Sequence, residues 1–168
     1  MRNALIFGLF LLVLSGCSGL NVSLLPKTGP LEEKVLEGEG KLKVLLVDLD
    51  GVISFKEERE SLFLKKGPSK VAFFREALLK AEDDPEIAGV IVRINSPGGS
   101  VAASDTIYHE IMSFRQKKRI PVYTHITELG ASGGYYVASA TDRIIASPTA
   151  IVGSIGVVAL KFNLEGLL

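Results

Sequence analysis

Short apolar runs recur along the chain and are separated by stretches of mixed polarity. The run at 43–49 (KVLLVDL) is bounded by glycines and predicts a buried strand. Three later runs, rich in β-branched residues, predict strands at 89–94, 121–126 and 143–146. The stretch at 151–160 is apolar and broken by glycines.

Amphipathic segments lie between these strands. Ser69 is a suitable N-cap for a helix that ends at Asp84, before Pro85. A second helix is predicted to end near Lys118, and a shorter one at 135–140. The apolar positions that recur at helical spacing are Val71, Phe74, Leu78 and Ala81 in the first helix, and Ile107, Ile111 and Phe114 in the second. This alternation predicts an α/β domain with a largely parallel sheet. Residues 52–68 are predicted to form a mobile charged loop.

Composition narrows the possible partners. The 168 residues fit one domain, and 19 basic side chains balance 19 acidic ones. A chain of zero net charge without a basic stripe gives no reason to expect a nucleic acid. Its one cysteine excludes an intrachain disulfide and a cysteine-rich zinc site.

The N-terminal residues 1–17 (MRNALIFGLFLLVLSGC) have the pattern of an export signal. A positive residue precedes an apolar run that is too short to span a bilayer, which takes about 20 residues. The ending L-S-G-C resembles a bacterial lipobox, in which Cys17 is lipidated. We therefore expect an exported, membrane-anchored lipoprotein, with residues 18–40 as a tether before a domain at 41–168. The alternative is an ordinary signal peptide with an incidental cysteine.

The sequence D-L-D-G-V follows the first predicted strand. It matches the start of haloacid-dehalogenase-type phosphatases, in which the residues at the positions of Asp48 and Asp50 act as nucleophile and general acid around Mg²⁺. The paired acidic motif that such an enzyme needs after a later strand is missing, since Asp83 and Asp84 lie at a helix end. The alternative is a strand end whose carboxylates face solvent.

A second motif, G-A-S-G-G at 130–134, lies between a strand and a helix. Its glycines permit a tight turn that presents the hydroxyl of Ser132. An α/β-hydrolase would need a histidine downstream of this serine, but His109 and His125 both lie upstream. That enzyme class is excluded, and a plain Gly/Ser turn remains the alternative.

The third motif, N-S-P-G-G-S-V at 95–101, follows the preceding strand. Two successive glycines can point main-chain N–H groups into a cleft, as an oxyanion hole requires. Consecutive strands of such a sheet tend to be neighbours, so we expect this turn and the Ser132 turn at one edge. Alone, the motif could equally be a turn that binds nothing.

These motifs in order, R-I-N-S-P-G-G-S-V, P-V-Y-T-H, A-S-G-G-Y-Y-V-A-S-A-T-D-R-I-I-A and G-S-I-G-V, resemble the SppA signal peptide peptidase family. The resemblance covers residues from about 43 to 168. It implies the ClpP/crotonase-like fold of stacked β-β-α units, a homo-oligomer, and Ser-Lys proteolysis of released signal peptides without metal or cofactor. By position it implies Ser132 as nucleophile and the Gly98 and Gly99 amides as oxyanion donors. It also implies a peptide groove lined by Gly153, Ser154, Ile155 and Gly156. In this family the strand at 44–50 opens the domain and ends in a turn. The D-L-D-G-V motif occupies that turn, so the resemblance implies that its match to the phosphatases is accidental.

One part of the family pattern is missing. The general-base lysine is expected several dozen residues after the serine, in a K-S-G-x-x-K-like stretch beyond residue 168, so the domain is expected to be truncated. Lys161 is the only lysine after Ser132, and its context does not match. Two alternatives stay open: an inactive lipoprotein that binds peptides, and a split enzyme whose lysine comes from another polypeptide.

Overall fold

The computed structural model describes residues 31–59, 66–158 and 166. Seven strands and three helices follow one another in these residues: β1 (Lys43–Asp50), β2 (Glu57–Arg59), β3 (Lys66–Ser69), α2 (Lys70–Asp83), β4 (Ile87–Ser96), α3 (Val101–Lys118), β5 (Val122–Ala131), α4 (Gly133–Ala138), β6 (Arg143–Ala146) and β7 (Ile151–Gly153). None of these helices is long and apolar enough to cross a membrane.

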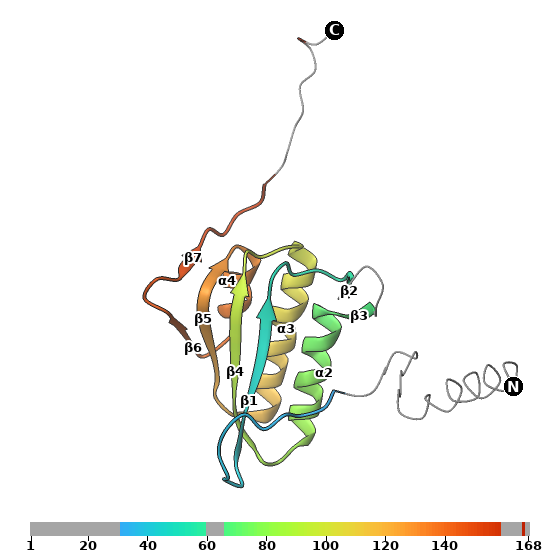
Figure 1. Cartoon of the computed structure of the whole chain (residues 1–168), viewed down its shortest axis with the longest axis vertical. Coiled ribbons are helices and arrows are strands. Elements are labelled where there is room, and N and C mark those ends of the chain that lie inside the picture. The colour runs from blue at the N-terminus through green and yellow to red at the C-terminus, as the bar shows by residue number, and fades with distance from the viewer. Residues whose placement is uncertain (1–30, 60–65, 159–165, 167–168) are drawn as a thin grey trace, which may run out of the picture. The chain divides into compact units, whose positions relative to one another are not determined.

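Five of the strands form one sheet. Strands β1, β4, β5 and β6 lie side by side in that order, and β7 pairs with the end of β5 (Figure 1). All of these pairings are parallel, as the sequence predicted. Strand β5 pairs with β6 from Tyr123 to Ile126 and with β7 from Leu129 to Ala131. The carboxyl end of β5 therefore has β7 as its outer neighbour.

Helices α2 and α3 pack on one face of this sheet (Figure 1). The predicted inward positions of α3 are almost fully buried, and Ser69 caps α2 by accepting a 3.2 Å hydrogen bond from the amide of Ala72. The core between helices and sheet is mainly aliphatic and includes the rings of Phe74 and Phe114; its largest fully buried side chains include Phe74, Leu49, Ile94, Ile107, Ile111 and Ile126. On the opposite face, Val44, Tyr123 and Ile145 stay at least 40% exposed.

The prediction of a mobile loop at 52–68 was wrong for the part that the structure describes. Strands β2 and β3 pair antiparallel, and Ile53 is fully buried. The amide of Ile53 donates to the carbonyl of Gly98, and its own carbonyl accepts from the amide of Ser100. Both pairings are made by main-chain groups, which any sequence can supply. The charged side chains of this segment do not show the alternation of apolar and polar residues that predicts a strand.

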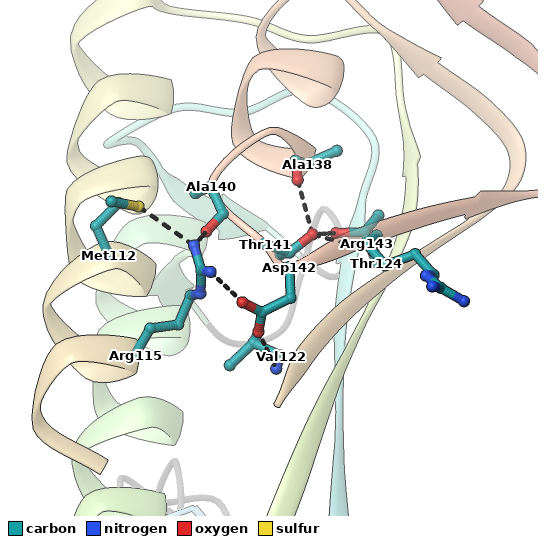
Figure 2. Close-up of polar contacts among 9 residues, drawn as sticks. All are labelled: Met112, Arg115, Val122, Thr124, Ala138, Ala140, Thr141, Asp142 and Arg143. Carbon is teal, nitrogen blue, oxygen red and sulfur yellow. Dashed lines mark hydrogen bonds and ion pairs between the residues drawn. The ribbon is translucent and has the colours of Figure 1, made fainter. Parts of the chain in front are cut away.

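A polar clamp joins the carboxyl half of α3 to the start of β5 (Figure 2). Arg115 donates to the carbonyl of Ala140 at 2.6 Å and forms an ion pair with Asp142. The other carboxylate oxygen of Asp142 accepts from the amide of Val122 at 2.8 Å. The clamp fixes the turn after α4 against the strand that leads to Ser132.

The predicted tether is described only from residue 31 onward, where it forms no helix or strand before β1. The amide of Leu31 donates to the carboxylate of Glu76 on α2 at 3.1 Å, and Leu31 packs against the core. Cys17 and the predicted export signal lie outside the described residues.

Candidate active site

The two turns singled out in the sequence meet at the carboxyl ends of β4 and β5. Ser96 pairs with Gly130 in the sheet, so the residues that follow each strand leave from the same edge. A Cβ atom added to Gly98 would lie 2.6 Å from the amide nitrogen of Gly133 and 2.9 Å from Cβ of Ser132. The backbone of the first turn therefore touches the second, and only glycine at position 98 permits this approach.

Ser132 lies between β5 and α4 in a conformation that side chains rarely adopt, with φ 51° and ψ −121°. Its amide donates to the carbonyl of Gly153 at 2.7 Å, and its carbonyl accepts from the amide of Tyr136 at 3.0 Å. Its side chain is partly exposed. A non-glycine residue held at positive φ by its surroundings is typical of a strained strand-to-helix turn that presents a nucleophile.

The Gly98 amide is not free to bind a substrate. It donates a 3.0 Å hydrogen bond to Oγ of Ser96, which in turn donates to the carbonyl of Gly51 at 2.6 Å. Ser96 is fully buried, so this chain of bonds is shielded from water. The prediction of Gly98 as an oxyanion donor is corrected accordingly: its amide ties the turn to the end of β1. The Gly99 amide, by contrast, has no acceptor among the described residues.

A second amide at this site was missed in the sequence. Gly133 begins α4, and its amide likewise has no acceptor in the part of the chain that the structure describes. A Cβ built on Gly133 would lie 3.4 Å from the Gly99 nitrogen, which places the two residues side by side. The Gly133 amide could have been predicted from the G-A-S-G-G motif, because the residue after the nucleophile supplies an oxyanion donor in G-x-S-x-G turns.

The predicted groove residues follow the nucleophile's neighbouring strand. Gly153 ends β7 at φ 94°, and Ser154 follows at φ 48°. Ile155 is 64% exposed, and a Cβ on Gly156 would meet nothing within 4 Å. The structure therefore brings Gly153 directly against Ser132 and leaves 154–156 open to a ligand.

No described side chain forms a hydrogen bond with Oγ of Ser132. His125 faces Oγ of Ser147 at 3.5 Å, and His109 lies 3.5 Å from the carboxylate of Asp105. Lys161 lies outside the described residues. A general base for Ser132 is therefore not among the side-chain contacts that the structure describes.

Asp48 does not have the environment of a phosphatase nucleophile. Both of its carboxylate oxygens accept 2.7 Å hydrogen bonds from the guanidinium of Arg93, its partner on β4. This pairing, with Asp48 as the leading cause, raises the pKa of Arg93. The described residues include no group of three or more His, Cys, Asp or Glu side chains that could hold a metal. The geometry favours a cross-strand ion pair over the phosphatase alternative.

Comparison with solved structures supports the class of fold. A serine-to-alanine mutant of the protease named 1510-N, described as membrane-bound and stomatin-specific, superposes with a TM-score of 0.52 at 23% identity. The match covers 70% of this chain and 49% of that one. The parallel sheet, the helices on its face and this superposition show the ClpP/crotonase-like fold.

Comparison of sequences then identifies the family. Residues 114–168 match the model of peptidase family S49. The chain is 35% identical over 137 residues to a candidate signal peptide peptidase SppA of Enterococcus faecium, covering 82% of this chain and 39% of that protein. It is 39% identical over 115 residues to Protease 4 of Haemophilus influenzae, covering 68% of this chain and 18% of that one. The chain belongs to the SppA family, and it spans about two fifths or less of the length of these two relatives.

Proposed function

We propose that this chain carries the nucleophile and oxyanion site of a serine peptidase of the signal peptide peptidase type. The observation that carries the proposal is the position of Ser132 on a strained turn beside the amides of Gly99 and Gly133, neither of which has an acceptor among the described residues. Membership of peptidase family S49 supports the same reaction class.

In the proposed mechanism, Oγ of Ser132 attacks the carbonyl carbon of a peptide bond, and its proton passes to a neutral lysine amine. The carbonyl oxygen becomes an oxyanion that accepts hydrogen bonds from Gly99 and Gly133. The C–N bond then breaks, the lysine protonates the leaving amine, and water hydrolyses the acyl-enzyme. The lysine is the one that the family resemblance implies; we place it outside the described residues or on another polypeptide.

We propose that the peptide lies along the outer side of β7 and residues 154–156. Strand β7 pairs with β5 on one side, and Ile151 and Val152 are 65% and 46% exposed. An extended peptide can add to such a strand through main-chain hydrogen bonds. The apolar exposed side chains suit the apolar segments of signal peptides, which are the substrates we propose.

A second function, peptide binding without turnover, is favoured by one observation: no described side chain forms a hydrogen bond with Oγ of Ser132. Loss of a general base lowers the rate by about 10²–10⁴-fold. The strand edge and the two amides do not depend on that base, so binding would persist.

A fluorophosphonate probe on the full chain tests the proposal. We expect labelling of the wild-type protein and none of Ser132→Ala, with Ser139→Ala, an exposed serine on the turn after α4, as the matched control. A quenched signal-peptide substrate measures turnover in the same samples. Labelling that appears only after a lysine-bearing partner is added indicates a split enzyme. Peptide binding without labelling indicates the second function, and labelling that persists in Ser132→Ala contradicts the proposed nucleophile.

We further propose that Cys17 anchors the protein to a membrane on the exported side. A lipobox cysteine carries two acyl chains, and stable anchoring takes more than one. Expression of Cys17→Ser in a bacterial host with a labelled fatty acid tests this. Wild type is expected to be labelled and found in the membrane fraction, and Cys17→Ser is expected to be unlabelled. Equal labelling of both proteins would contradict the anchor.

A further inference from the structure

One buried hydroxyl near the candidate site has no assigned role. Ser104 lies in the first turns of α3 and is 2% exposed, yet its Oγ makes no hydrogen bond among the described residues. Buried polar groups are almost always hydrogen-bonded, so such a group calls for an explanation. An alanine would fill nearly the same space without burying a hydroxyl.

Ser104 lies directly against the residue that follows the nucleophile. A Cβ built on Gly133 would overlap Oγ of Ser104 and would lie 3.1 Å from its Cβ. The same position is 3.4 Å from the amide nitrogen of Gly99. The hydroxyl therefore borders the space between the two residues whose amides are free, Gly99 and Gly133.

The contacts around Ser104 hold α4 close to it. Tyr136 on α4 donates a 2.8 Å hydrogen bond to Asp105, the residue after Ser104, and stacks on Tyr108 with ring centroids 4.7 Å apart. A Cβ on Gly134 would lie 2.9 Å from the carbonyl oxygen of Ser96. The Gly133–Gly134 pair is thus packed on two buried serines, of which Ser96 is fully hydrogen-bonded and Ser104 is not.

We propose that Ser104 is a positioning residue for the oxyanion site. Its hydroxyl keeps the Gly133 backbone at a fixed separation from Gly99, so that both amides point at the same oxygen. The proposal rests on the proposed function. It implies that removing the hydroxyl slows reaction at Ser132 without lowering the stability of the fold, because the hydroxyl makes no bond that folding would lose.

The test compares the rate of fluorophosphonate labelling in full-length Ser104→Ala with that of wild type. The matched control is Ser113→Ala, the same change at an exposed position of α3. We expect Ser104→Ala to label about 10–100-fold more slowly, since small displacements of catalytic groups cost rates of this order. We expect its denaturation midpoint to equal or exceed that of wild type. Unchanged labelling in Ser104→Ala would overturn the proposal.

A reciprocal pair separates positioning from a general loss of folding. Gly133→Ala places a methyl group on Oγ of Ser104 and is expected to abolish labelling. Adding Ser104→Gly removes the obstruction, and we expect the double variant to recover labelling in part. If Ser104→Ala proves less stable than wild type, the labelling of the double variant becomes the decisive measurement. Failure of the double variant to recover labelling would then overturn the proposal.

Amide resonances distinguish failure of this proposal from failure of the proposed function. If the wild-type protein does not label, either alone or with a lysine-bearing partner, the peptidase proposal has failed. The ¹H–¹⁵N resonances of Gly99 and Gly133 are then compared between wild type and Ser104→Ala. Shifts at both residues, absent in Ser113→Ala, support the positioning role, and unchanged resonances overturn it.

Discussion

The main-chain N–H of Ser132 donates a 2.7 Å hydrogen bond to the carbonyl oxygen of Gly153. Both residues have positive φ, 51° and 94°. Ser132 directly follows β5, and Gly153 ends the neighbouring parallel strand β7. The bond therefore fixes the candidate nucleophile relative to the start of the candidate groove. A peptide that pairs with β7 would be held in a defined register with Ser132.

The strain at Ser132 predicts a conflict between stability and activity. A side chain at positive φ costs about 1–3 kcal/mol, and glycine avoids most of this cost. We expect Ser132→Gly to raise the free energy of unfolding by about 1 kcal/mol relative to Ser132→Ala. Chemical denaturation of the two variants measures the difference.

The matched control for this prediction is Ser113→Gly compared with Ser113→Ala. Ser113 is exposed within α3, where the backbone is helical and φ is negative. There glycine should be less stable than alanine by about 0.5–1 kcal/mol. Equal stabilities of Ser132→Gly and Ser132→Ala would show that the turn carries no strain.

Gly99 is expected to tolerate no side chain. A Cβ at this position would overlap the carbonyl oxygen of Ile53 and lie 2.7 Å from its nitrogen. Both atoms belong to the main-chain bridge that holds Ile53 against Gly98 and Ser100, so neither can move without breaking a hydrogen bond. We expect Gly99→Ala to lower the free energy of unfolding by roughly 3–5 kcal/mol, the range of severe core disruptions.

Thermal or chemical denaturation checks the Gly99 prediction. Gly40→Ala is the matched control, because a Cβ there meets its nearest atom at 3.7 Å and its φ is ordinary. We expect it to differ from wild type by less than about 0.5 kcal/mol. A Gly99→Ala protein as stable as Gly40→Ala would refute the close approach of the two main-chain segments.

Much of the fold could be predicted because its signals are local. The period of Ile107, Ile111 and Phe114 identified the buried side of α3, and β6 has the predicted bounds of 143–146. The end of β5 could not be predicted in this way. Residues 127–129 are Thr, Glu and Leu, and they extend the strand because β7, some twenty residues later, pairs beside its carboxyl end.

The candidate site also has one part that could be predicted from local sequence and one part that could not. The glycine pattern around Ser132 predicted a tight turn that presents its hydroxyl, from sequence alone. The use of the Gly98 amide could not be predicted, because it depends on Oγ of Ser96 and on the carbonyl of Gly51, which follows β1 and lies 45 positions before Ser96. Which main-chain groups remain free is a property of the folded arrangement, while the residues that permit a turn are visible in the sequence.

The hydrogen bond from Tyr136 to Asp105 should make the α3–α4 contact sensitive to alkaline pH. This bond, with burial as a second cause, raises the pKa of Tyr136 above its usual 10.0. A raised folded-state pKa means that the contribution is present below about pH 10 and is lost as the pH rises through the folded value. We expect Tyr136→Phe to be less stable than wild type at pH 7, because the hydrogen bond to Asp105 is lost while the stack on Tyr108 is retained.

Alkaline titration of tyrosinate absorbance checks this assignment. Tyr136→Phe is expected to remove a tyrosine that titrates above pH 10, and Tyr123→Phe, on the open face of the sheet, is the matched control. Loss of the late-titrating group in the control, and its survival in Tyr136→Phe, would contradict the assignment.

The clamp between Arg115 and Asp142 should weaken in acid. The amide of Val122, and then the guanidinium of Arg115, hold the pKa of Asp142 below its usual 3.8, although burial opposes them (Figure 2). A depressed folded-state pKa means that the stabilisation is present above about pH 4 and is lost as the pH falls through the folded value. We expect Asp142→Asn to be less stable by about 1–2 kcal/mol at pH 7, a range reduced for the partial exposure of the pair.

Denaturation at pH 7 and at successively lower pH should show the difference in stability between Asp142→Asn and wild type shrinking below pH 4. Asp83→Asn, at an exposed site on the last turn of α2, controls for the removal of a charge alone. A difference that stays constant down to the lowest pH would mean that the Asp142 carboxylate does not supply the clamp's stability.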